Sequence, residues 1–192
     1  MAALVSCGGW VNSIMAILPY LPGPNVLELG YGPGHLQLAL SQAGRKVAGI
    51  DISRQMGKIT RRRMGREGQE YRLVNGYAQS LCFPQQTFQQ VVATYPSEYI
   101  FDPLSLQEIQ RVLAPGGQLV ILITAWLTGK SICHQLTRLF IPFTKPNSTR
   151  NLERMLLPFK EAGLTANFIQ VECESTRLLL VLAQSNESNE TG

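Results

Sequence analysis

The chain has 192 residues and a formal net charge of +4; 45% of its residues are hydrophobic and 16% are charged. This composition is ordinary for one globular domain and excludes a fibrous or wholly disordered chain. The longest apolar run, residues 119–127, is too short to cross a bilayer, and the N-terminus lacks the basic segment and apolar core of a secretory signal. We therefore expect one cytoplasmic domain over residues 1–184, without stable membrane insertion, and a polar tail over residues 185–192.

The first predicted element is a helix over residues 10–21, which Pro22-Gly23-Pro24 ends. Its apolar residues recur at helical spacing and share one face. They are Trp10, Ile14, Ile17, Leu18 and Leu21.

A strand over residues 25–29, a glycine cluster and a helix over residues 34–43 follow. Gly30, Gly32 and Gly34 allow the backbone to approach a ligand closely, and the helix after them offers unpaired N–H groups. Asp51 closes the next strand, where a carboxylate can accept hydrogen bonds from ribose hydroxyls. These residues indicate a site for a nucleotide-like ligand.

Basic residues crowd the end of the next predicted helix, residues 53–64, in the stretch Lys58 to Arg66. Cations near a helix C-terminus complement the helix dipole and project into water, which is the simpler explanation. A patch that binds an anionic partner is the alternative.

Strands and helices go on alternating, which is typical of a parallel sheet covered by helices on both faces. We predict strands at 46–50, 71–74, 90–94 and 118–124, and helices at 104–113 and 151–162. Residues 125–150 show no clear periodicity. The last two strands, 165–172 and 177–184, are separated by so few residues that they must form an antiparallel hairpin.

The four cysteines are scattered without C-x-x-C spacing, and the chain has only two histidines. This pattern suggests neither a disulfide framework nor a metal site. We expect Cys7, Cys82, Cys133 and Cys173 to be reduced thiols and no metal to be bound.

The glycine spacing separates two families of ligand. A dinucleotide fingerprint, G-x-G-x-x-G, would need its third glycine at His35. The observed pattern, Glu28-x-Gly30-x-Gly32-x-Gly34, resembles the first motif of class I S-adenosylmethionine-dependent methyltransferases. The resemblance covers about residues 24–184 and is most similar to the small bacterial quinone-biosynthesis-like group. Other matching segments are Gly49-Ile-Asp-Ile-Ser53, Phe88-Gln-Gln-Val-Val-Ala-Thr94 and Arg111-Val-Leu-Ala-Pro-Gly-Gly-Gln-Leu-Val120.

The resemblance implies an α/β fold, with a seven-stranded, mostly parallel Rossmann-like sheet, an antiparallel last strand and helices on both faces. It implies S-adenosylmethionine as cofactor and S-adenosylhomocysteine as product. Asp51 would hold the ribose, Ile52 would pack on adenine, and Glu28 would either bind the cofactor or order the glycine turn. The cofactor-binding residues implied are Glu28, Gly30, Tyr31, Gly32, Gly34, His35, Asp51, Ile52, Ala78, Gln79 and Thr94.

One departure from the family pattern concerns adenine. The family usually has Gly-Asp-Ala after its third strand, with the aspartate accepting from the adenine amino group, whereas this chain has Gly76-Tyr77-Ala78. The N–H of Ala78 remains available for a ring nitrogen, and Gln79 or Ser80 could replace the lost acceptor.

The acceptor side is expected at the end of the fourth strand. Tyr95, Glu98 and His134 are the candidate catalytic residues that could orient or deprotonate an acceptor, although a packing or solvent-facing role is as reasonable for each. Tyr95-Pro96-Ser97 is not the Asn/Asp-Pro-Pro-Tyr/Phe motif of enzymes that methylate base nitrogens, and the Pro-Cys of cytosine C5 enzymes is missing. We therefore expect no nucleic-acid partner.

Two segments are expected to close the site. Residues 1–23 would form a lid over the cofactor end, and the apolar residues 125–150 would form a cap over the acceptor. The spacing within the second segment would also permit a helix lying on a membrane surface.

The chemistry implied is metal-independent, in-line transfer of a methyl group to a small, apolar or aromatic acceptor. The alternative is a noncatalytic S-adenosylmethionine-binding or regulatory module, since Tyr77 replaces the usual aspartate and no decisive base is evident. A nicotinamide-dependent oxidoreductase is a third possibility. The sequence leaves the oligomeric state and the acceptor open.

Overall fold

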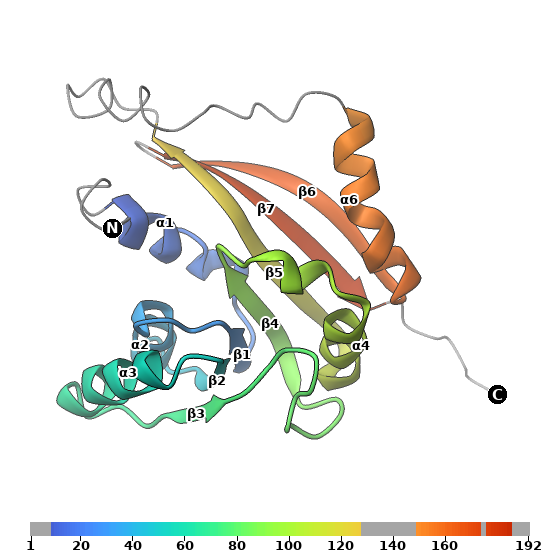
Figure 1. Ribbon diagram of the computed structural model, residues 1–192. Coiled ribbons are helices and arrows are strands. Elements are labelled where there is room, and N and C mark those ends of the chain that lie inside the picture. The colour runs from blue at the N-terminus through green and yellow to red at the C-terminus, as the bar shows by residue number, and fades with distance from the viewer. Residues whose placement is uncertain (1–8, 128–148, 174–175, 186–192) are drawn as a thin grey trace.

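The computed structural model describes residues 9–127, 149–173 and 176–185. Seven strands form one sheet in the order β3-β2-β1-β4-β5-β7-β6 (Figure 1). They are β1 (Asn25–Leu29), β2 (Lys46–Asp51), β3 (Arg72–Asn75), β4 (Phe88–Thr94), β5 (Leu113–Leu127), β6 (Leu164–Cys173) and β7 (Thr176–Ser185). Strands β1 to β5 pair in parallel, and β7 is antiparallel to both of its neighbours. The predicted fold class is confirmed.

Helices cover both faces of the sheet (Figure 1). On one face, α1 (Gly9–Met15), α2 (His35–Gln42) and α3 (Arg54–Arg66) bury their apolar residues in a core with β1, β2, β4, β5 and β7. On the other face, α4 (Pro103–Val112) and α6 (Thr149–Glu161) pack over a second core. The central strand β5 supplies both: Leu119 and Ile121 belong to one core, Val120 and Leu122 to the other, because side chains alternate along a strand.

The N-terminal helix is shorter than predicted. Helix α1 ends at Met15, and a 3₁₀ turn, η2 (Leu18–Tyr20), replaces the predicted continuation to residue 21. Pro19 explains the break, because proline has no N–H to donate and its ring clashes with the carbonyl four residues earlier. Ile17 and Leu21 are still fully buried, so the predicted apolar face survives the break.

The segment predicted as an irregular cap, residues 125–150, is partly regular. Strand β5 is longer than the predicted 118–124 and includes Ala125 and Trp126, which pair with Leu178 and Arg177 of β7. At the other end, α6 already begins at Thr149. The sequence missed both because neither stretch has a clear period of its own. Residues 128–148, with His134, lie outside the described residues.

The carboxyl ends of β1, β2 and β4 meet at one edge of the sheet, where the glycine turn and Asp51 also lie. Ligands of open α/β sheets bind outside this edge. None of the helices in the described part is long and apolar enough to cross a membrane. Cys82 and Cys173 are free thiols.

Candidate functional site

The turn between β1 and α2 has a backbone that only glycine adopts readily. Gly30, Gly32 and Gly34 have φ angles of +69°, +50° and +76°. At Gly34 there is a second restriction, because a Cβ there would lie 2.3 Å from Cγ2 of Thr60. At Gly32 a Cβ would approach no atom closer than 4.0 Å, so there the turn is open.

Two side chains tie down Gly32. Its N–H donates to Oδ2 of Asp51 at 2.8 Å, and its carbonyl accepts from the Thr60 hydroxyl at 2.7 Å. The other carboxylate oxygen of Asp51 accepts from the N–H of Ser53 at 2.7 Å. Asp51 therefore links the turn to the end of β2 and the start of α3, a structural role that the sequence did not reveal.

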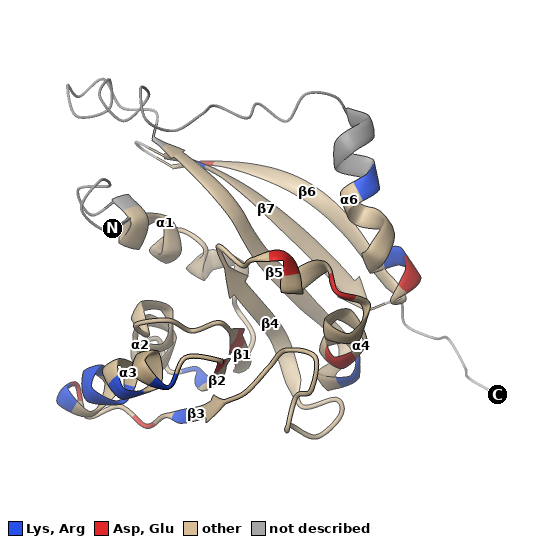
Figure 2. Cartoon of the chain, viewed as in Figure 1, with Lys and Arg blue, Asp and Glu red and all other residues tan. Residues whose placement is uncertain are grey.

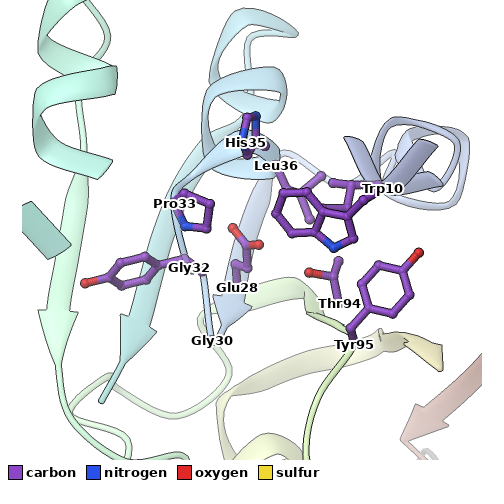
Figure 3. A pocket seen from close by; sticks show the side chains of 11 residues that line it. Trp10, Glu28, Gly30, Gly32, Pro33, His35, Leu36, Thr94 and Tyr95 are labelled. Carbon is purple, nitrogen blue, oxygen red and sulfur yellow. The ribbon is translucent and has the colours of Figure 1, made fainter. Parts of the chain in front are cut away.

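A cavity of about 170 Å³ opens beside this turn (Figure 3). Glu28 and the turn lie on one side of it, and Trp10, Thr94 and Tyr95 lie on the other (Figure 3). Its lining residues are Trp10, Ile14, Glu28, Gly30, Tyr31, Gly32, Pro33, His35, Leu36, Thr94 and Tyr95. The cavity thus joins predicted cofactor residues with one predicted catalytic residue, Tyr95.

Glu28 is buried at the base of the cavity, with a relative exposure of 2%. Its Oε2 accepts from Nε2 of Gln37 at 2.9 Å. Burial raises the pKa of Glu28 from 4.5 to about 8; the hydrogen bond from Gln37 opposes this rise, and the charge of Asp51 adds to it. The carboxyl is therefore mostly protonated at neutral pH, and a cation bound beside it would favour its ionisation.

Tyr31 touches the cavity, but its ring is buried and packs between two glycines. A Cβ at Gly49 in β2 would lie 2.6 Å from Cδ1 of Tyr31, and one at Gly57 in α3 would lie 3.0 Å from the Tyr31 hydroxyl. The ring thus fills the space between β2 and α3. Its main contacts are structural, and they explain why small residues stand opposite it.

His35 connects three helices at the rim. Its ring makes an edge contact with Trp10 of α1, with centroids 5.4 Å apart, and its Nδ1 lies 3.1 Å from Nη1 of Arg63 in α3. A guanidinium can only donate, so Nδ1 accepts and the proton of the neutral ring is on Nε2. Burial lowers the pKa of His35, and the charge of Arg63 lowers it further.

Tyr95 and Tyr99 are hydrogen-bonded phenols near the end of β4. The Tyr95 hydroxyl lies 2.5 Å from the Ser13 hydroxyl of α1, and the Tyr99 hydroxyl donates to the Leu29 carbonyl at 3.3 Å. Burial raises the pKa of both, and for Tyr99 the charges of Glu28 and Asp51 add to the effect. Both phenols are therefore protonated at neutral pH and can orient an acceptor, but they are poor bases.

Tyr95 also has a positive φ of 49°, which is uncommon for a residue other than glycine. Such strained residues gather at binding and active sites, where the surrounding contacts hold them in place. Here the contact to Ser13 fixes the ring against α1.

The expected adenosine end lies beyond Asp51. Ile52 and Tyr77 are both 66% exposed, so their side chains are free to contact a flat ring. Ala78 is buried, and the side-chain amide of Gln79 already donates to Asp102 at 2.9 Å. Gln79 therefore presents its carbonyl oxygen, not its NH₂ group, as the free hydrogen-bonding atom.

The remaining predicted site residues are more distant from the cavity. Glu98 begins the 3₁₀ turn η3 (Glu98–Phe101), is exposed and is not among the lining residues. The sequence did not single out Pro33, Leu36 or Tyr99 as part of the cofactor site. Trp10 and Ile14 were signalled only by their place on the apolar face of the N-terminal helix. Within the described part of the chain, no group of three or more ligating side chains could hold a metal ion.

Comparison with known proteins agrees with this geometry. Residues 26–117 match a family model described as a methyltransferase domain. A demethylmenaquinone methyltransferase of Lysinibacillus sphaericus is 31% identical over 121 residues, which are 61% of this chain and 51% of that protein. The chain spans about half the length of the curated relatives it matches.

Solved structures show the same fold at low identity. The YcgJ protein of Bacillus subtilis superposes with a TM-score of 0.67 at 16% identity, covering 92% of this chain and 99% of that one. A phosphoethanolamine N-methyltransferase of Haemonchus contortus, solved with S-adenosylhomocysteine, gives a TM-score of 0.66 at 15% identity, covering 95% and 57%.

By fold and by sequence, the chain belongs to the class I S-adenosylmethionine-dependent methyltransferases. Within that class its sequence is of the quinone-biosynthesis type. The site fits the family cofactor: the turn is open at Gly32, Glu28 is a buried carboxyl group beside the cavity, and the exposed Ile52 directly follows Asp51.

Replacing Asp51 by alanine should weaken the binding of S-adenosylhomocysteine more than tenfold, which corresponds to about 1.5–3 kcal/mol. The variant loses a carboxylate suited to the ribose and also the tie to Gly32. Thr60→Val is the matched control, because it removes the other tie to Gly32 without touching a ribose ligand. Titration calorimetry should show a much smaller loss for Thr60→Val; equal losses would mean that Asp51 acts only through the turn.

Glu28→Gln should change how stability depends on pH. Between pH 4.5 and about 8 the unfolded chain ionises this carboxyl while the folded protein keeps its proton, so the wild type loses stability as pH rises through this window. The neutral variant avoids this loss, which is on the order of 4 kcal/mol. Urea unfolding at pH 5, 7 and 9 should show the variant gaining on the wild type with rising pH. A constant difference would contradict the assignment, and Glu98→Gln controls for the loss of an exposed carboxylate.

Proposed function

We propose that this protein transfers a methyl group from S-adenosylmethionine to a small aromatic acceptor of the quinol or phenol class. One observation carries the proposal: the cavity places the glycine turn and Glu28 directly opposite Trp10, Thr94 and Tyr95. The first group suits the charged methionine part of the cofactor, and the second suits an aromatic ring. The relatives named demethylmenaquinone methyltransferases support an acceptor with a quinone-type ring.

The cofactor would be held along the carboxyl edge of the sheet. Asp51 would accept from the ribose hydroxyls with the lone pairs that Gly32 and Ser53 leave free. Ile52 and Tyr77 would contact adenine, and Glu28 would face the positively charged end. The Nε2–H of His35 offers a donor at the rim.

The bound cofactor supplies an already activated methyl group, so the residues of the chain mainly align the partners and exclude water. Trp10 and Ile14 of α1 form one wall of the cavity. Tyr95, fixed by Ser13, is placed to donate a hydrogen bond to an oxygen of the acceptor. Because both phenols stay protonated, the site suits an electron-rich acceptor that needs little help from a base.

Calorimetry and a methyl-transfer assay together test this function. We expect binding of S-adenosylmethionine and S-adenosylhomocysteine but not of NAD, and labelled methyl transfer to tail-free naphthoquinols or related phenols. Asp51→Ala is the matched inactive control. Cofactor binding without transfer to any such acceptor would favour a noncatalytic binding module, and binding of NAD alone would refute the proposal.

Tyr77→Asp restores the residue usual in the family and should raise the preference for adenine over other bases. A site that accepts a hydrogen bond from the amino group rejects analogues without it far better than a site that only packs against the ring. Competition binding with S-adenosylhomocysteine and its inosine analogue measures this preference. Unchanged discrimination would show that another acceptor, such as the carbonyl oxygen of Gln79, already does the work.

A further inference from the structure

The positive charge of the protein is concentrated on a single helix. Helix α3 contains one lysine and five arginines and no acidic residue. Without it, the chain has eleven basic and thirteen acidic residues, a net charge of −2 instead of +4. Figure 2 shows the basic residues lying along α3, at the β3 edge of the sheet.

Four of these residues form a row on the outer face of α3. Arg54, Lys58, Arg62 and Arg66 follow one another at intervals of four, and all four are exposed. The buried residues of the helix, Gly57, Thr60 and Met64, lie on the opposite face. The row extends over about 18 Å at 1.5 Å per residue.

Interactions within the protein do not explain this row. The helix dipole favours cations only near the C-terminus, yet Arg54 and Lys58 lie in the first half of α3, where the dipole disfavours them. Like charges four residues apart also repel one another. In the described part of the chain, no α3 side chain belongs to an ion pair; the two ion pairs there join Arg111 to Glu108 and Arg177 to Glu172. The row is therefore a weakly unfavourable arrangement that an external anion would relieve.

We propose that the outer face of α3 docks the protein on an anionic lipid surface. The choice of lipid rests on the proposed function, because a quinone that carries an isoprenoid tail dissolves in the bilayer. The shape also fits, since a straight row on a convex helix meets a flat array of phosphates, whereas single-stranded nucleic acid is usually held in a groove with stacked bases. The row begins at Arg54, immediately after Ser53, whose N–H binds Asp51 in the site.

Vesicle co-sedimentation tests the docking without any acceptor. The wild type should bind vesicles of phosphatidylglycerol and phosphatidylcholine, should not bind phosphatidylcholine alone, and should dissociate at high salt. The double variant Lys58→Gln/Arg62→Gln should bind about tenfold more weakly or worse. The matched control is Arg154→Gln/Lys160→Gln, which removes the same charge from exposed positions on α6, on the other face of the sheet. Equal binding by the two double variants would overturn the proposal.

Two further measurements separate this proposal from its alternatives. A short RNA duplex is offered in the same assay: if the α3 variant loses RNA binding while no protein binds vesicles, the row recognises nucleic acid and the lipid proposal is wrong. The α3 variant should also keep wild-type methyl transfer to a tail-free quinol and lose it to a vesicle-embedded one. Because the docking assay contains no quinone, failure of the proposed methyl transfer leaves its outcome readable.

Discussion

The turn between β1 and α2 is the constraint on which the rest of the site depends. Three left-handed residues in five bring the chain from the sheet edge into α2, and each must be glycine for its backbone angle. The turn keeps this shape because Asp51 holds the N–H of Gly32 and Thr60 holds its carbonyl. The same carboxylate thus shapes the turn and lies where a ribose would bind, so local structure and ligand recognition share one residue.

Around this turn, the interior is adjusted to unusual side chains. Tyr31 stands between the first two glycines and would clash with β2 or α3 if Gly49 or Gly57 had a side chain. Glu28 is tolerated in the core because it keeps its proton and accepts a hydrogen bond from Gln37. Burying such a group costs stability, and costs of this kind are typical of functional sites.

The acceptor side is built differently. Its residues come from segments far apart in the chain, and Tyr95 is fixed by Ser13, 82 residues away. Its strained backbone and the edge contact between Trp10 and His35 join α1 to the ends of β4 and the glycine turn. The walls of the cavity therefore move only if α1 moves, which makes α1 the natural element to control access.

The sequence by itself determined the fold class, the order of strands and helices and the cofactor turn. Each depends on local patterns: glycine spacing, alternation of apolar runs, and a carboxylate at a strand end. It misjudged the helix over residues 10–21, where Pro19 overrides the apolar face, and the ends of β5, which pairing with β7 extends. Only the tertiary structure decided that Glu28 is buried and protonated, that Tyr31 points into the space left by two glycines, and that the α3 charges have no ion-pair partner among the described residues. These properties depend on which atoms of distant segments come together, and no spacing along the chain encodes that.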